Sequence, residues 1–75
     1  MDDIETAVVK IVEQEMVREG VRLEDKFSSL GADELDMLAI AMVLEDMYSI
    51  RVDDNAMKKI RRVRDLAEYI KGALR

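Results

Sequence analysis

Few side chains in this sequence could carry out chemistry on their own. The chain contains no His and no Cys, which removes the commonest general base, the commonest metal ligand and the cysteine nucleophile. Carboxylates, lysines, two tyrosines and three serines are the reactive groups that remain. We therefore expect a protein that is not an enzyme. Without cysteine, neither a disulfide nor a thiolate metal site can form.

The densest group of carboxylates is Asp33, Glu34 and Asp36, directly after Gly31 and Ala32. Such a cluster could hold Ca²⁺ or Mg²⁺ weakly, but it lacks the Asp-x-Asp-x-Asp-Gly spacing of a dedicated calcium loop. Asp33 is instead well suited to cap a following helix, and Glu34 and Asp36 would add negative charge to its first turn. We predict no metal site.

The length and charge of the chain limit its architecture and partners. Seventy-five residues suffice for one domain, residues 1–75, and a chain with one Phe and no Trp needs an aliphatic core. Residues 1–57 carry 15 acidic and 5 basic side chains, whereas residues 58–75 carry 2 and 7. An acidic body favours basic partner surfaces and repels nucleic acid. The acidic start and the absence of an apolar run of about 18 residues predict a soluble cytoplasmic protein without a membrane span.

The first part of the chain predicts a helix followed by a long loop. Apolar residues recur with helical spacing over residues 2–17, with acidic residues in the first turn. Gly20 would take a left-handed conformation just past the end of this helix. No sustained period follows over residues 21–33, so we expect a loop that packs against the core through its own side chains. Those side chains are Val21, Leu23, Phe27 and Leu30.

The second predicted helix runs from its capping residue Asp33 to about Tyr48. Nine of the ten residues over 35–44 are apolar, which indicates a helix that is central in a bundle or faces a ligand or partner on one side. Glu45 and Asp46 would be exposed.

Two further helices complete the predicted layout. A short third helix ends near Ile60, and a last helix starts at Val63 or Arg64 and extends to about Leu74. The fold class is therefore all-α, a small four-helix bundle with three longer helices and one short helix. The candidate caps of the short helix are Asp53, Asp54 and Asn55.

The stretch around the carboxylate cluster closely resembles the signature of the acyl carrier protein family, in which Gly-Ala-Asp is followed by Ser, Leu and Asp. The resemblance covers essentially the whole chain, because Leu-Glu-Asp-Met-Tyr over residues 44–48 and Glu-Tyr-Ile over residues 68–70 are also similar to family patterns. The residues that match the signature are Gly31, Ala32, Asp33, Leu35 and Asp36.

The resemblance implies a four-helix bundle whose second helix is recognised by partners. In the family a 4′-phosphopantetheine arm is attached at the start of that helix, where the helix dipole favours a phosphodiester. The implied function is a non-enzymatic acyl shuttle of fatty-acid or polyketide-type lipid metabolism, and we expect a monomer that meets enzymes with basic docking surfaces. The docking residues implied here are Asp33, Asp36, Met42, Glu45 and Asp46.

One departure from the family pattern affects the cofactor. Glu34 stands where the family has its attachment serine, and a carboxylate would have to form an unstable acyl phosphate instead of a phosphodiester. We therefore predict that this chain takes no arm at Glu34 and has no cofactor as written. Glu34 is either an anionic group in the place of the phosphate or an ordinary first-turn acid. Ser28 and Ser29 are nearby hydroxyls, but they lack the flanking Asp-x-Leu pattern.

A second departure is the basic cluster over residues 58–64, where relatives are acidic or neutral. The cluster could bind nucleic acid, an anionic membrane surface or an acidic patch of a partner. No aromatic side chain lies nearby to stack bases, so nucleic acid is the least favoured of these. Pairing within the chain is at least as favoured, although exposed pairs contribute only about 0–1 kcal/mol each. The partners considered for it are Asp53, Asp54, Asp65 and Glu68.

Two alternatives remain open at the level of sequence. The chain could be a non-carrier interaction module that keeps the fold and binds a partner through the second and third helices. Four methionines could either fill the core or line an adaptable pocket for an acyl chain, and core is the more frequent role. These are Met37, Met42, Met47 and Met57.

Overall fold

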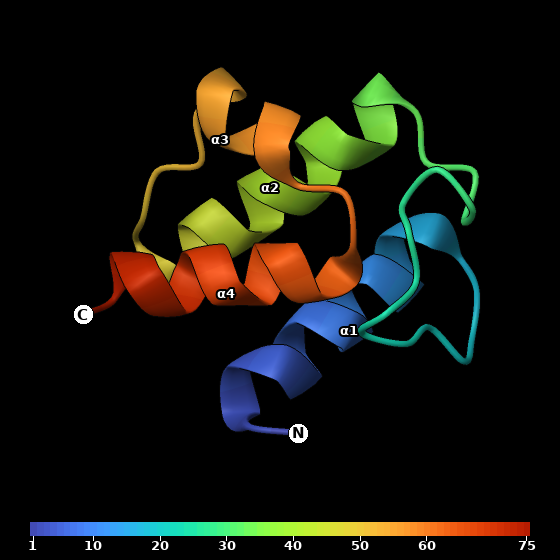
Figure 1. Ribbon diagram of the computed structural model, residues 1–75, viewed down its shortest axis with the longest axis horizontal. Helices are drawn as coiled ribbons and strands as arrows, with labels where there is room; N and C mark the ends of the chain where they lie inside the picture. Colours follow the sequence, from blue (N-terminus) through green and yellow to red (C-terminus); the bar gives the residue numbers. More distant parts are fainter.

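The computed structural model describes all 75 residues and contains four helices and no β-sheet. In Figure 1 the last helix lies across the first, the second runs diagonally above the last helix in this view, and the short third helix lies at the edge opposite the N-terminus. The prediction of an all-α four-helix bundle is confirmed. The helices are α1 (Asp3–Met16), α2 (Glu34–Tyr48), α3 (Asp54–Lys59) and α4 (Val63–Ala73).

The core is aliphatic and is built by three of the four helices. α1, α2 and α4 each contribute side chains that are completely buried, whereas α3 buries none. Because the domain is small and has no disulfide, burial of these side chains is the main source of its stability. The largest fully buried side chains are Val8, Val12, Ile40, Leu44, Val63, Leu66 and Ile70.

The two ends of α1 are set by different local contacts. At the start, the Asp2 carboxylate accepts a hydrogen bond from the Glu5 amide at 2.8 Å, and the Glu5 carboxylate accepts one from the Asp2 amide at 2.9 Å. At the end, Val17 takes the left-handed conformation, with φ 52°. Gly20 takes the left-handed conformation predicted for it, but Val17 and not Gly20 is the residue that directly ends the helix. The amides of Val17 and Arg18 already donate to carbonyls of the last turn, so the helix closes before Gly20, which is left-handed within the loop.

The loop between α1 and α2 is packed against the core, as predicted. Val21, Leu23, Phe27 and Leu30 are all buried. The loop is also tied by backbone hydrogen bonds to the segment that leads into α4. The Phe27 amide donates to the Arg61 carbonyl at 2.9 Å, next to an antiparallel bridge between residues 26 and 62. This pairing brings two segments that are distant in sequence to one side of the molecule.

α2 has the predicted bounds, but one of its side chains is placed differently. The helix ends at Tyr48, and Ser49 takes the left-handed conformation after it. Glu45, which we predicted to be exposed, is half-buried and accepts a hydrogen bond from the Val52 amide at 2.7 Å. The carboxylate is drawn inward because the extended segment between α2 and α3 has a backbone donor that no helix satisfies.

The C-terminal elements agree with the prediction within one residue. Asp53 caps α3 by accepting a hydrogen bond from the Ala56 amide at 2.8 Å, and α3 ends at Lys59, one residue before the predicted Ile60. α4 begins at Val63 and ends one residue before the predicted Leu74.

Candidate functional site

The signature segment forms the start of α2. Asp33 is the capping residue, and its carboxylate accepts a hydrogen bond from the Asp36 amide at 2.8 Å. The Asp36 carboxylate in turn accepts one from the Asp33 amide at 3.0 Å. Gly31 approaches this start with φ +79°, a backbone conformation that side chains rarely tolerate. The result is a rigid, well-capped helix start whose first residue, Glu34, is exposed and makes no ion pair.

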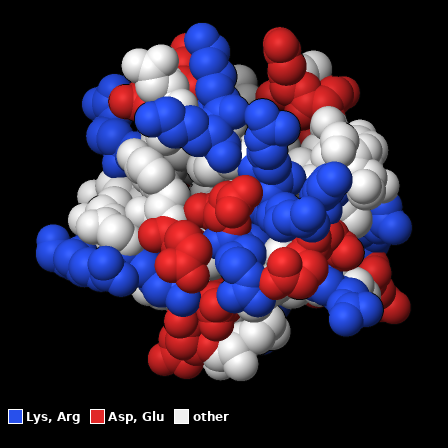
Figure 2. All heavy atoms as spheres, viewed as in Figure 1, with Lys and Arg blue, Asp and Glu red and all other residues white.

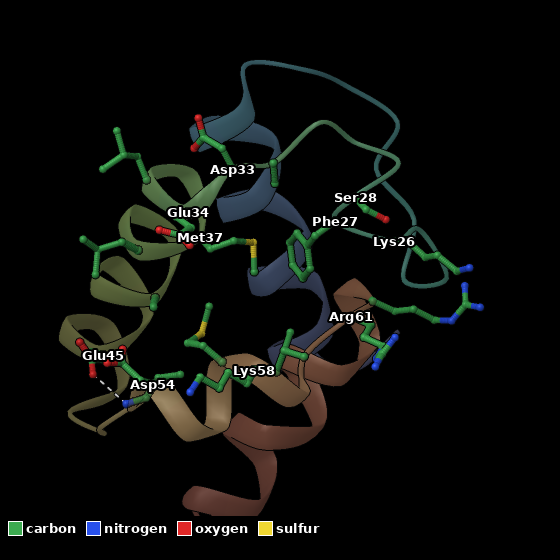
Figure 3. Close-up of a pocket in the computed structure, with 18 residues that line it drawn as sticks. Lys26, Phe27, Ser28, Asp33, Glu34, Met37, Glu45, Asp54, Lys58 and Arg61 are labelled. Atoms are coloured by element: carbon green, nitrogen blue, oxygen red, sulfur yellow. Dashed lines mark hydrogen bonds between the residues drawn. The ribbon is translucent and has the colours of Figure 1, made fainter.

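A groove of about 1290 Å³ lies between α2, α3 and the loop before α2. Figure 3 shows the side chains of Phe27 and Met37 pointing into it, with Glu34 on the α2 side and Lys58 and Arg61 on the opposite side. Nine of its 18 lining residues are apolar. The groove therefore has an apolar floor between an acidic α2 wall and an opposite wall that carries Lys58 and Arg61 as well as Asp54.

The outward side of α2 is apolar. Leu35, Leu38 and Met42 are 75%, 56% and 57% exposed, and they lie three and four residues apart, on one side of the helix. We call these three residues the apolar stripe. Exposed apolar residues that form a contiguous row are typical of an interaction surface. The apolar run in the sequence pointed to such a surface, although it did not identify its residues.

The five predicted docking residues are placed in two different ways. Met42 and Asp46 are exposed on α2 and free to contact a partner directly. The carboxylates of Asp33, Asp36 and Glu45 are each engaged by a backbone amide of their own chain. These three residues fix the shape of the surface, and each carboxylate retains acceptor capacity for a further donor.

The basic cluster of residues 58–64 divides into paired and unpaired cations. Arg64 forms ion pairs with Glu5 and Glu24, and the Arg62 guanidinium donates to the Glu24 carbonyl at 2.7 Å. The expected partners were therefore wrong for these two arginines, because the fold brings the loop residue Glu24 beside them. The Asp65 carboxylate instead accepts hydrogen bonds from the backbone amides of Arg62 and Arg61. These two bonds, the one from Arg62 above all, lower the pKa of Asp65.

Four unpaired cations lie on α3 or beside its connection to α4. Lys26, Lys58 and Arg61 line the groove, whereas Lys59 lines a smaller hollow with Asp53, Asp65 and Glu68. Lys58, Lys59 and Arg61 make no side-chain hydrogen bond or ion pair, and the bridge between residues 26 and 62 brings Lys26 to the same side. We call these four residues the basic patch. Figure 2 shows basic side chains gathered over α3 and the connection to α4. Sequence reasoning missed Lys26, because nothing in its neighbourhood along the chain signals a contact with the α3–α4 connection.

The methionines are not all core residues. Met37 packs against the core and Met57 is half-buried at the groove, whereas Met42 and Met47 are exposed, so the core role was wrong for these two. They lie on the outward turns of α2, which the other helices do not cover. No group of three or more acidic side chains is gathered as metal ligands. None of the four helices has both the length and the apolar character needed to cross a bilayer.

Comparisons with known sequences agree with this geometry. The family model described as "Phosphopantetheine attachment site" matches residues 6–70. The chain is 37% identical to an acyl carrier protein of Helicobacter hepaticus over 74 residues, covering 96% of this chain and 97% of that one. It is 39% identical to an acyl carrier protein of Wolinella succinogenes over 70 residues, covering 92% and 90%.

Solved structures show the same likeness. The crystal structure of an acyl carrier protein from Thermotoga maritima matches with a TM-score of 0.79 at 32% identity, covering 92% of this chain and 84% of that one. The solution structure of the acetyl actinorhodin acyl carrier protein from Streptomyces coelicolor matches with a TM-score of 0.67 at 27% identity, covering 97% and 87%.

These matches extend over nearly the whole chain and include the capped start of α2, so they do not favour a module from outside the carrier class. The chain belongs to the acyl carrier protein family, whose members are non-enzymatic acyl carriers of lipid metabolism.

Proposed function

We propose that residues 1–75 form a single carrier-type domain that docks through α2 onto enzymes of lipid metabolism but takes no phosphopantetheine arm at Glu34. The observation that carries this proposal is the carboxylate at residue 34. This residue is the first of α2, directly after the cap Asp33. The resemblance of residues 31–37 to the family signature aligns it with the attachment serine.

The side chain at residue 34 does not fit the arm. Attachment needs a hydroxyl that attacks the pyrophosphate of coenzyme A, and Glu34 has no hydroxyl. The nearest serines by sequence, Ser28 and Ser29, are exposed in the turn before α2. They lie outside the helix start, where amide groups and the helix dipole favour an anion. Reaction at either serine would therefore lack the support that the helix start gives.

Two features of α2 support docking onto a basic surface. Asp46 and Glu34 are exposed carboxylates that make no ion pair, and the apolar stripe lies beside them. Charged residues at the edge of an apolar contact chiefly set the association rate and the choice of partner. We assign Met42 and Asp46 to direct contact, and Asp33, Asp36 and Glu45 to shaping the docking surface. That the domain works as a monomer in the cytoplasm stays a prediction.

The attachment chemistry is tested by intact mass. Wild-type protein and the Glu34→Ser variant are each incubated with coenzyme A and a broad-specificity phosphopantetheinyl transferase. We expect the mass of one arm to be added to Glu34→Ser and not to the wild type. A triple variant that adds Ser28→Ala and Ser29→Ala to Glu34→Ser serves as the control, and it should gain the arm equally.

Two results would contradict the proposal in different ways. A mass gain in the wild type would assign attachment to Ser28 or Ser29, and peptide mapping would distinguish the two. No gain in either protein would show that the surface read by the transferase has changed as well, which would leave carrier-type docking without support.

A further inference from the structure

We propose that the groove between α2 and α3 is a docking site for an acidic amphipathic helix of a partner protein. This inference goes beyond the carrier role, and it holds whether or not residue 34 can take an arm. The partner helix would place apolar side chains on the groove floor and carboxylates against Lys26, Lys58 and Arg61.

The shape of the groove suits a polypeptide segment. Its volume of about 1290 Å³ is larger than that of most small-molecule sites, which are about 300–1000 Å³. Phe27, Met37, Met57 and Ile60 are among the apolar residues that line it. α3 has only six residues and buries none of them, so it forms a low wall. A helix laid on an apolar groove is a recurring mode of peptide recognition.

The basic patch provides charges that the chain itself leaves unsatisfied. Arg64 and Lys71 are paired with acidic residues of α1 and of the loop. The four cations of the patch have no such partner, although three of them lie within four residues of one another. Neighbouring like charges repel, and an external anion relieves that repulsion. Lys26, Lys58 and Arg61 all line the groove.

The charge of the whole molecule selects the kind of anion. The chain has a net charge of −5, and without the four cations of the patch the remainder would carry −9. A long polyanion such as nucleic acid, or an extended anionic bilayer, would meet this acidic remainder as well as the patch. A helix with a short acidic flank can lie in the groove with that flank against Lys26, Lys58 and Arg61 and turned away from the carboxylates on the α2 side. The opposite wall carries Glu34, so the other flank of the partner helix would be neutral or basic.

Two designed peptides test the proposal directly. Each is an amphipathic helix of about 18 residues, hence about 27 Å long, which matches the 29 Å longest dimension of the protein. Both have the same leucine face, and one carries Glu and the other Lys along one flank. Net charge alone predicts that the acidic protein prefers the Lys peptide. The proposal predicts that the Glu peptide binds about tenfold tighter by fluorescence anisotropy, with affinity falling as salt rises.

Matched variants locate the contact. Lys58→Glu with Arg61→Glu should weaken binding of the Glu peptide about tenfold, whereas Lys10→Glu with Arg75→Glu should change it less than about twofold. Both pairs alter net charge equally, and all four residues are exposed and free of ion pairs, so both variants should fold. Circular dichroism checks folding, and amide chemical shifts of the wild type should move at groove residues when the Glu peptide is added.

The opposite results would overturn the proposal. These are tighter binding of the Lys peptide, no binding of either peptide, equal losses in the two variant pairs, or shifts confined to residues outside the groove. Binding to vesicles rich in phosphatidylglycerol provides a further test. Binding to them that depends on Lys58 and Arg61 and exceeds binding of the Glu peptide would assign the patch to a membrane surface instead.

Discussion

The two sides of the bundle satisfy their charges differently. All five salt bridges lie on the side built by α1 and α4, where Lys71 meets Asp2 at 2.6 Å and Glu5 at 3.3 Å, and Arg64 meets Glu5 and Glu24. No salt bridge involves α2 or α3. The α1–α4 side therefore pairs several of its charges with one another, whereas no ion pair forms on the α2–α3 side.

Apolar residues follow the same division. α4 buries Val63, Leu66, Ala67 and Ile70. α2 buries Ile40, Ala41 and Leu44 on its inner side, but it also exposes the apolar stripe, and α3 buries nothing. Leaving apolar surface in water costs free energy, so a surface of this kind is typical of a site that is covered by a partner for part of the time. The difference indicates that the α1–α4 side supports the fold and that the α2–α3 side is available for recognition.

Truncation of the α1–α4 core should have the largest effect on stability. Leu66 is completely buried, and Leu66→Ala removes its contacts and leaves a cavity, at a cost of about 2–5 kcal/mol. At about 0.05–0.15 kcal/mol per residue, this is a large fraction of the total for a chain of 75 residues. Urea unfolding followed by circular dichroism measures the loss.

If Leu66→Ala does not fold, the milder variant Ile70→Val still allows the loss of stability to be measured. Ile70 is also completely buried, and removal of one methyl group should cost about 0.5–1.5 kcal/mol. A loss below that range for Ile70→Val, together with a folded Leu66→Ala variant of wild-type stability, would contradict the assignment of the α1–α4 side as the support of the fold.

The left-handed residues that end α1 and α2 allow a second comparison. Their replacement by glycine should stabilise the fold, by less than the truncation of the core destabilises it. Val17 has φ 52° and Ser49 has φ 54°, and this conformation costs an L-residue about 1–2 kcal/mol. Glycine avoids that cost, so Val17→Gly should raise the free energy of unfolding by about 1 kcal/mol. Ser49→Gly should gain less, because Ser is not β-branched. The urea midpoints of both variants measure these gains, and a larger gain in stability for Ser49→Gly than for Val17→Gly would refute this account.

Much of this architecture could be predicted from local patterns. The bounds of α2 and α3 follow from capping residues, Asp33 and Asp53, which act on amides three residues away, and the buried loop residue Phe27 follows from the lack of any other aromatic anchor nearby. Interactions of this range are encoded in neighbouring residues, so sequence patterns report them reliably.

The errors mainly concern contacts between distant segments. The pairing of Arg64 with Glu24 and the bridge between Lys26 and Arg62 depend on how the loop lies against the α3–α4 connection. No periodicity encodes that arrangement. The end of α1 near Val17 agrees with the prediction, and what the sequence did not show is that Val17 itself is left-handed there, since the amides of Val17 and Arg18 close the last turn before Gly20 is reached.

Because of the ion pairs on the α1–α4 side, the stability of the fold should decrease as the pH falls into the acidic range. The pKa of Asp2 is lowered from 3.8, mainly by its hydrogen bond with Lys71, and the pKa of Glu5 is lowered from 4.5, mainly by the Asp2 amide and then by Lys71. A carboxylate with a lowered pKa stabilises the fold above its unfolded pKa, and that contribution is lost as pH falls through the folded pKa. We expect the urea midpoint to fall below about pH 4.5.

Lys71→Gln should make that acid response smaller. The pKa of Lys71 is raised, mainly by Asp2, so its contribution is present below its unfolded pKa of 10.5 and disappears as pH rises above it. The variant should lose this alkaline decline and part of the acid decline, while the part due to Asp65 remains because backbone amides cause it. Lys10→Gln, which changes the same charge without an ion pair, should retain the full wild-type pH profile.

The smallest effect on stability is expected for Leu35→Gln on the apolar stripe. Leu35 is 75% exposed, and Leu and Gln have nearly equal helix propensities, so the substitution tests side-chain burial with little change in the backbone. The free energy of unfolding should change by less than about 0.5 kcal/mol, against the about 2–5 kcal/mol for the buried Leu66. A loss above about 1 kcal/mol would mean that Leu35 supports the fold, and the contrast between the two sides would then fail. An unchanged stability would mean that folding gains nothing from this leucine, which leaves contact with another molecule as the physical reason for an apolar residue there.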